Sequence, residues 1–236
     1  MAGAYEHRPP YPGAVFDRLD ELAQPGPVLE IGAGSGDVTV ELASRFGRVD
    51  AVEPSTAMLA IGKGRVGGNV RWFHTTVEDA ALEGPYGLAV AAESIHWTSW
   101  ETTFPAIARV LAPGAVLALI WRVEEPVAWA TALGSLIDRY STNREFRKVD
   151  LVEELQERRL FAVRGSWESP RQLHRQTVES YIESFHSRNG FSRDRMTGAD
   201  ASAFDEGVRS LVQPHLRDGL VPLSVSARLT WGVPMP

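Results

Sequence analysis

The chain has 236 residues, a formal net charge of −6 and no cysteine. The lack of cysteine excludes thiol catalysis, thiolate metal sites, iron–sulfur clusters and disulfides, and the acidic balance argues against a strongly electropositive nucleic-acid binder. No apolar run approaches the ~20 residues that span a bilayer, and residues 1–11 lack the features of a secretory signal, so we expect a soluble cytoplasmic protein without a membrane partner.

Short β-rich apolar runs alternate with helical patterns through the first half of the chain. Five runs are predicted as strands: 27–31, 49–53, 70–74, 88–92 and 115–121. Helical spacing of apolar residues predicts helices at 37–46, from 54 through 61, and at 100–111. Alternation at this spacing implies βαβ units, and therefore a parallel α/β sheet with right-handed crossovers.

The pattern changes after Arg122, where the chain becomes mostly helical and rich in Arg and Glu. Two helices, at 127–140 and 151–161, are predicted to form a cap inserted after the fifth strand. A sixth strand is expected at 173–177, helices at 178–188 and 201–216, and a seventh strand at 222–231. The expected division is 1–24 as an N-terminal lid and helix, 25–122 as a cofactor-binding core, 123–170 as the cap, and 171–236 as the rest of the core.

A glycine-rich segment gives the sharpest functional signal. Glycines at 32, 34 and 36 lie between the first strand and the first helix, where the missing Cβ lets the backbone turn tightly and approach a ligand. A dinucleotide site would have a third glycine at position 37, which here is Asp37. Because Asp37 and Glu30 would repel a diphosphate, the loop favours a ligand with an ammonium and a sulfonium, such as S-adenosylmethionine.

Two further acidic positions follow strands. Glu53 ends the second strand, where its carboxylate can accept hydrogen bonds from both hydroxyls of a ribose. Glu78 follows the third strand and is a weaker candidate for the edge of an adenine.

Together these residues resemble the class I S-adenosylmethionine-dependent methyltransferases, in a small-molecule branch that includes trans-aconitate-methyltransferase-like enzymes. Besides the glycine loop, residues 5–12 resemble its RPxYP segment, 77–79 its acidic motif after the third strand, 93–97 its HW segment, and 108–114 its RVLxPGG turn. Val77 replaces the usual aromatic residue, and Ala115 replaces the second glycine. The resemblance implies a Rossmann-like, seven-stranded, mostly parallel sheet.

The resemblance also implies roles for particular residues. Gly32, Ala33 and Gly34 would approach the methionine part of the cofactor, with Glu30 near its amino group. Glu53 would bind the ribose, and Pro54 and Met58 would pack beside adenine. The Val77 N–H and Glu78 would lie at the adenine edge, and the Ala92 carbonyl would face the ammonium. Tyr5, Arg8 and Tyr11 would belong to a lid, with Arg8 reaching the cofactor carboxylate; the alternative for Tyr11 is a packing role.

His96, just past the fourth strand, is the first candidate for a general base if the acceptor is an alcohol, phenol or amine. Its alternative, shared with Trp97, is to pack the pocket wall, and a carboxylate acceptor would need no base. Aromatic residues crowd the expected substrate side, and we predict that Tyr11, Trp97, Trp121, Arg122 and Trp129 bind substrate, although at least two of the tryptophans of this region are expected to be packing residues. Arg122 could instead pair with Glu124 or Glu125. No spacing of histidines and acids predicts a metal.

The predicted function is methyl transfer from S-adenosylmethionine to the oxygen, nitrogen, carbon or carboxylate of a small molecule, in secondary metabolism for example, by a monomer or homodimer. One alternative is a nicotinamide-dependent oxidoreductase, against which Asp37 argues. The other is a non-catalytic protein that kept the cofactor-binding fold. A nucleic-acid substrate is disfavoured by the net charge of −6.

Overall fold

A computed structural model describes residues 2–144 and 149–236. The chain divides into two compact units. One, here called the sheet unit, comprises residues 11–123, 149–170 and 226–236, and the other, the helical unit, comprises residues 1–10, 124–148 and 171–225. No helix in the described part of the chain is both long and apolar enough to cross a membrane.

The sheet unit holds the parallel strands. They are β1 (Val28–Ile31), β2 (Val49–Val52), β3 (Val70–Phe73), β4 (Leu88–Ala92) and β5 (Leu117–Glu124). The sheet order is β3-β2-β1-β4-β5-β8-β6, with β7 (Gln172–Gln176) pairing β8 (Val221–Pro234). The pairings β1–β2, β1–β4, β2–β3 and β4–β5 are parallel, and β8 is antiparallel to both β6 (Phe161–Glu168) and β7. This is the predicted α/β fold with a mostly parallel sheet.

Successive strand residues face opposite sides of the sheet, so each strand feeds two cores. On one face Val28, Leu88 and Val90 pack with α1 (Ala14–Leu22) and α2 (Asp37–Arg45). On the other face Leu29, Ala89 and Leu117 pack with α4 (Trp100–Val110) and α6 (Leu151–Glu157). Because every one of these strands is covered on both sides, the sequence shows continuous apolar runs there rather than alternation.

Strand order reverses between β1 and β4, since the chain runs outward through β2 and β3 and then returns to β4 and β5. Val28 pairs with Leu88 and Glu30 with Val90, so β1 and β4 end at the same edge of the sheet. In open α/β sheets such a reversal opens a crevice beyond the carboxyl ends of the two strands. The glycine loop after β1 therefore lies where this fold binds ligands. Helix α3 (Thr56–Lys63) follows β2, with the Ser55 hydroxyl accepting a hydrogen bond from the Met58 N–H at its start.

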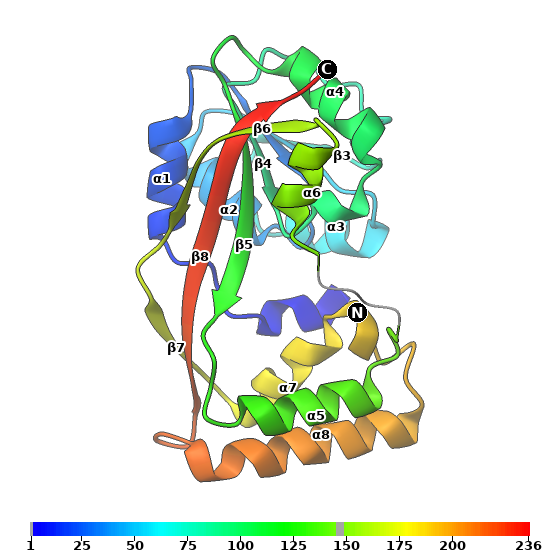
Figure 1. Cartoon of the computed structure of the whole chain (residues 1–236). Helices are drawn as coiled ribbons and strands as arrows, with labels where there is room; N and C mark the ends of the chain where they lie inside the picture. Colours follow the sequence, from blue (N-terminus) through cyan, green and yellow to red (C-terminus); the bar gives the residue numbers. More distant parts are fainter. Residues whose placement is uncertain (1, 145–148) are drawn as a thin grey trace. The chain divides into compact units, whose positions relative to one another are not determined.

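The helical unit is built on α5 (Ala130–Tyr140), α7 (Val178–His186) and α8 (Gly198–Val212), with the short 3₁₀ helices η1 (Ala2–His7), η3 (Asn189–Phe191) and η4 (Gln213–His215). Phe185, Phe191 and Phe204 form an aromatic core between α7 and α8. Helices α5 and α8 run side by side (Figure 1).

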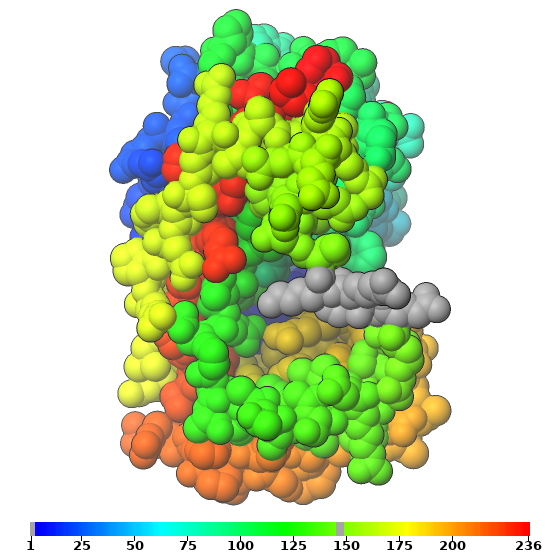
Figure 2. Space-filling model, viewed as in Figure 1, coloured from blue at the N-terminus to red at the C-terminus, as the bar shows by residue number. Residues whose placement is uncertain are grey.

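The structure divides the chain differently from the predicted lid, core and cap. Residues 149–170, predicted as part of the cap, belong to the sheet unit, where α6 covers one face and β6 pairs with β8. They form part of the surface of that unit, drawn in yellow-green in Figure 2. Helices α7 and α8, predicted as part of the core, belong to the helical unit. Residues 145–148 of the predicted cap lie outside the described residues.

Candidate functional site

The loop between β1 and α2 has the backbone that only glycine adopts easily. Gly32, Gly34 and Gly36 have φ of +68°, +58° and +85°. A Cβ on Gly32 would lie 2.5 Å from the Cβ of Ser94, so the chain after β4 can approach this closely only because residue 32 is glycine. A Cβ on Gly34 would meet nothing within 4 Å. The middle of the turn is therefore open on the side where a side chain would project.

Glu53 joins the end of β2 to this loop. Its carboxylate is buried (7% exposed), with Oε2 accepting from the Gly34 N–H at 2.8 Å and Oε1 from the Ser55 N–H at 2.8 Å. An ionised carboxylate has about four lone-pair sites, so each oxygen keeps one for a further donor. The sequence analysis identified the residue, and the structure adds that Glu53 also orders the glycine loop.

Glu30, on β1 just before the loop, is 2% exposed. Burial raises the pKa of its carboxyl to about 8, and the charges of Asp37 and Glu53 add to this effect, against a smaller lowering by Thr39. Its Oε2 atom has no hydrogen-bond partner among the described residues. A cationic group in contact with such a buried, unpartnered carboxyl stabilises its ionised form.

Asp37, the residue that argued against a dinucleotide, starts α2 and forms an ion pair with Arg65. Arg65 also donates to the Ser35 carbonyl at 3.0 Å. Arg65 lies 28 residues after Asp37, and nothing in the sequence near either residue indicates that they pair. This ion pair was therefore not predicted. Among the described residues neither Glu30 nor Glu53 forms an ion pair of this kind, so the loop keeps its acidic character.

The residues predicted to meet adenine lie in different surroundings. Pro54 is exposed and Met58 half-buried at the start of α3, whereas the Val77 side chain is buried in the core with Ile31. One Glu78 oxygen accepts from the Ser99 N–H at 2.6 Å and from the Thr103 hydroxyl at 2.8 Å. Although burial opposes it, these bonds hold the pKa of Glu78 below its usual value.

This carboxylate therefore secures the start of α4, a structural role that the sequence analysis did not assign. The adenine contact predicted for Glu78 stays a prediction.

At the ends of β4 and β5, three side chains form a cluster. The Arg122 guanidinium stacks on the Tyr11 ring, 4.3 Å from its centroid, and lies 3.8 Å from Oε2 of Glu93. The Arg122 backbone N–H donates to the other Glu93 oxygen at 3.0 Å. Arg122 is thus paired with Glu93 rather than with Glu124 or Glu125, which corrects that alternative. Its side chain is 7% exposed, and its Nε has no hydrogen-bond partner among the described residues.

Residues 92–94 carry strain next to this cluster. Ala92 ends β4 half-buried, and Glu93 has a φ of +51°, which is uncommon for a residue with a side chain. The Ser94 hydroxyl donates to the Ile31 carbonyl at the end of β1. Strained backbone of this kind is concentrated at functional sites. Glu93 and Ser94 belong to the segment at 93–97 on which the resemblance rests, but no role was predicted for either residue.

His96 and Trp97 lie on the 3₁₀ turn η2 (Ile95–Trp97), and both are exposed. Trp97 is 68% exposed, and its ring centroid lies 4.9 Å from that of His96. Trp121 is half-buried against the core that contains Ile31. The structure therefore leaves both His96 and Trp97 accessible to solvent on this turn.

Trp129, Tyr5 and Arg8 belong to the helical unit. Trp129 is buried in its core and donates through Nε1 to the Tyr181 hydroxyl at 3.1 Å. Its indole thus packs inside this unit, and the substrate contact predicted for Trp129 stays a prediction. Arg8 stacks on Tyr5 and donates to Oγ of Ser187 at 2.7 Å and to the Ser187 carbonyl at 3.1 Å. The cofactor contacts predicted for Tyr5 and Arg8 stay predictions of the resemblance.

Comparison with known proteins matches residues 28–114 to a family described as a methyltransferase domain. An uncharacterized methyltransferase of Mycobacterium tuberculosis is 34% identical over 139 residues, which cover 58% of this chain and 57% of that protein. An uncharacterized methyltransferase of Schizosaccharomyces pombe is 29% identical over 144 residues, or 56% of this chain and 55% of that protein. The chain thus spans little more than half the length of these curated relatives.

Solved structures extend the match over nearly the whole chain. A proposed type II methyltransferase of Anaeromyxobacter dehalogenans superposes with a TM-score of 0.65 and 25% identity, covering 97% of this chain and 99% of that one. Geranyl diphosphate C-methyltransferase of Streptomyces coelicolor, solved with S-adenosyl-L-homocysteine, gives a TM-score of 0.51 at 18% identity, covering 94% and 78%, and shows the shared fold. The predicted resemblance to the class I S-adenosylmethionine-dependent methyltransferases is confirmed, with residues 28–114 matching the methyltransferase domain.

Proposed function

We propose that this chain transfers the methyl group of S-adenosylmethionine to a small-molecule acceptor, at an oxygen, nitrogen or carbon atom or at a carboxylate. The observation that carries the proposal is the pair of buried carboxylates, Glu30 and Glu53, on either side of the open turn at Gly34. S-adenosylmethionine offers an ammonium, a sulfonium and two ribose hydroxyls. An acidic cradle favours such cationic and donating groups over a pyrophosphate.

Three structural observations support the binding of this cofactor by the residues present. Oε2 of Glu30 is buried without a partner, the Gly34 turn leaves open space, and each Glu53 oxygen retains a lone pair beside its backbone N–H bond. We propose that Glu53 accepts from the ribose hydroxyls, and that Glu30 and the Ala92 carbonyl face the ammonium. Seven further residues are proposed to surround the rest of the cofactor: Gly32, Ala33 and Gly34 at the methionine, Pro54 and Met58 beside adenine, and Val77 and Glu78 at the adenine edge.

The cofactor supplies a methyl group already activated by the sulfonium. The chain therefore has to hold the acceptor in line with that methyl and keep water away, and such orientation contributes roughly 7–11 kcal/mol to lowering the barrier. We propose that Tyr11, Trp97, Trp121 and Arg122 provide the acceptor side of the site. Because Glu93 already offsets the charge of Arg122, this cluster works as a fixed polar wall rather than as a free cation.

His96 is the proposed general base. It is exposed on the turn after β4, where its neutral imidazole would take the proton of an alcohol, phenol or amine acceptor, a contribution of about 10²–10⁴-fold. A carboxylate acceptor would leave His96 without a chemical role.

The oxidoreductase alternative is not favoured, since the family, the relatives and the solved structures are methyltransferases. We further propose a small-molecule acceptor, in secondary metabolism for example, and a cytoplasmic monomer or homodimer without a nucleic-acid or membrane partner. A net charge of −6 supports the absence of nucleic acid. The Streptomyces neighbour, whose acceptor is geranyl diphosphate, supports a small molecule.

The test is to incubate the protein with cofactor labelled at the methyl group and a panel of alcohols, phenols, amines and carboxylates. Labelled product is expected with at least one class. With a protic acceptor, His96→Ala should lower kcat by at least about 100-fold and remove the limb of the pH profile that reports the base. Cofactor binding without any product across the panel and in cell-extract metabolites would favour the non-catalytic alternative, and unchanged turnover of His96→Ala would remove the base.

A further inference from the structure

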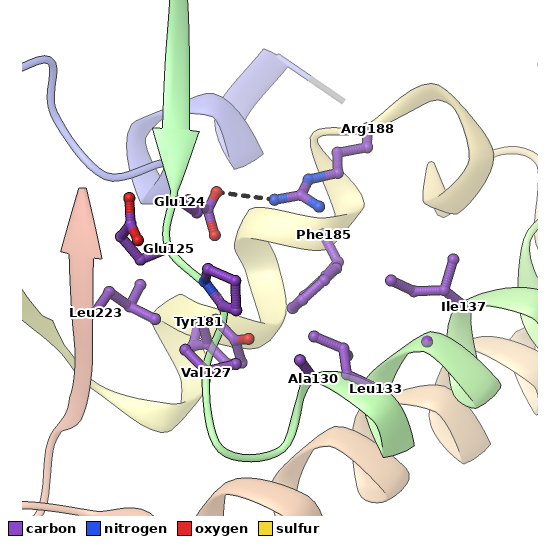
Figure 3. Close-up of a pocket in the computed structure, with 12 residues that line it drawn as sticks. Glu124, Glu125, Val127, Ala130, Leu133, Ile137, Tyr181, Phe185, Arg188 and Leu223 are labelled. Carbon is purple, nitrogen blue, oxygen red and sulfur yellow. Dashed lines mark hydrogen bonds and ion pairs between the residues drawn. The ribbon is translucent and has the colours of Figure 1, made fainter. Parts of the chain in front are cut away.

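The helical unit contains a pocket that no predicted site residue lines. It has a volume of about 200 Å³ and lies between α5, α7 and the segment that follows β5. Figure 3 shows Ala130, Leu133 and Ile137 of α5 on one side and Tyr181 and Phe185 of α7 opposite them. Its wall is therefore predominantly apolar, as in sites for small organic molecules.

Helix α5 is poorly covered on the side that faces this pocket. None of its eleven residues is buried, although its apolar positions repeat at helical spacing. One stripe, which includes Tyr140, packs toward α8. The stripe at Ala130, Gly134 and Ile137 lines the pocket instead. Apolar side chains beside an unfilled hollow lose packing contacts, and a ligand of matching shape would supply them.

Both carboxylates that line the pocket are paired with arginines. At one end Glu124 accepts from Arg188 at 3.0 Å, as the dashed line in Figure 3 shows, and Glu125 pairs with Arg171 at 3.0 Å. With both carboxylates already paired, an ionised ligand would find no excess charge to offset its loss of water.

Tyr181 is the polar group within the apolar part. The residue is 2% exposed, and its hydroxyl oxygen accepts a hydrogen bond from Nε1 of Trp129 at 3.1 Å. The proton of the hydroxyl can therefore be donated to another group. Burial raises the pKa of this phenol to about 12, so the proton is present at neutral pH. A ligand oxygen that accepts this hydrogen bond would satisfy the hydroxyl completely.

We propose that this pocket binds a compact, uncharged, largely apolar molecule with an oxygen atom that accepts a hydrogen bond from Tyr181.

Gly134 provides a variant that fills the pocket without disturbing the fold. A Cβ at this position meets nothing within 4 Å, and leucine has a higher helix propensity than glycine. Gly134→Leu places its side chain on the stripe between Ala130 and Ile137. Gly198→Leu is the matched control, because Gly198 starts α8, also has open space at its Cβ, and does not line the pocket.

The experiment is calorimetric titration of the full chain with three probes of similar size: acetophenone, which is neutral and carries one carbonyl; ethylbenzene, which lacks the acceptor; and benzoate, which is charged. Acetophenone should bind saturably, at least tenfold more weakly to Gly134→Leu, and unchanged to Gly198→Leu. Tyr181→Phe should weaken acetophenone about fivefold, the loss of one neutral hydrogen bond, and leave ethylbenzene unaffected. Benzoate should bind more weakly than either neutral probe.

Absent or non-saturable binding of acetophenone, equal binding by Gly134→Leu, or a preference for benzoate would overturn the proposal. Titration with S-adenosylmethionine, run on the same samples, separates the two claims. A chain that binds the cofactor but not acetophenone contradicts the pocket proposal alone. A chain that binds acetophenone but not the cofactor contradicts the proposed function and leaves the pocket supported.

Discussion

A buried acid such as Glu30 makes stability depend on pH in a direction opposite to that of most carboxylates. Its folded-state pKa of about 8 lies above the unfolded value of 4.5, so the folded protein holds a proton that the unfolded chain loses. The stability associated with this proton is complete below pH 4.5 and is lost as the pH rises to 8. At 1.36 kcal/mol per pKa unit, the loss amounts to about 5 kcal/mol at most.

Glu30→Gln keeps the shape of the side chain and removes this titration. The free energy of unfolding of the variant should therefore exceed that of the wild type by a margin that grows between pH 5 and pH 8, measured by urea denaturation without cofactor. Glu21→Gln, at an exposed position paired with Arg18, is the control and should give a curve parallel to that of the wild type. A parallel curve for Glu30→Gln would show that Glu30 is already ionised in the folded state.

Glu53 is expected to contribute binding energy through charge-assisted hydrogen bonds, each worth about 1.5–3 kcal/mol. Glu53→Ala should therefore weaken S-adenosylmethionine binding by at least tenfold in calorimetry. Because Glu53 also holds the Gly34 N–H, Glu53→Gln, whose amide oxygen can still accept one backbone hydrogen bond, separates loop order from ligand contact. An unchanged cofactor affinity for Glu53→Ala would remove Glu53 from the site.

At the scale of elements, substitution of Glu78, which follows β3, tests its structural role at α4 and its proposed contact with adenine. Its contacts with Ser99 and Thr103 secure the start of α4, and loss of such a cap costs about 1–2 kcal/mol. Glu78→Ala should lower the free energy of unfolding by that amount and also weaken cofactor binding by about tenfold, through loss of the proposed hydrogen bond to adenine. Glu101→Ala, at an exposed position in the same helix, should lower stability by less than 1 kcal/mol. A cofactor affinity that changes by less than about threefold in Glu78→Ala would contradict the adenine contact and leave only the structural role.

The elements that carry the cofactor site could be predicted because local chemistry dictates them. Glycines at φ between +58° and +85° have few substitutes, and strands covered on both faces leave continuous apolar runs. Strand β6 was missed and its first residue, Phe161, was assigned to a helix, although exposure alternates along residues 161–168. Its alternation of small, charged and aromatic residues, including Gly165, is a weak signal without the pairing to β8 that defines it.

Trp129 shows why the surroundings of a single side chain could not be predicted from the sequence. Its partners, Tyr181 and His215, lie 52 and 86 residues away in the sequence, so nothing local distinguishes a tryptophan of a pocket wall from one of a core. The same holds for the pairing of Arg122, which depends on which strand ends lie together.

At the scale of the whole molecule, the cofactor residues of these predictions, Glu30, Glu53 and Glu78, all belong to the sheet unit. The apolar pocket belongs to the helical unit. Each can therefore be probed by its own ligand on the intact chain. The central claim concerns the sheet unit: its glycine loop binds a cationic nucleoside rather than a dinucleotide.

The most direct test of that claim is calorimetric titration of the wild-type protein at pH 7.5 with S-adenosylmethionine, its demethylated product and NAD⁺. The account predicts saturable binding of the first two with one site per chain and no measurable binding of NAD⁺. Binding of NAD⁺ without binding of S-adenosylmethionine or its product would contradict it.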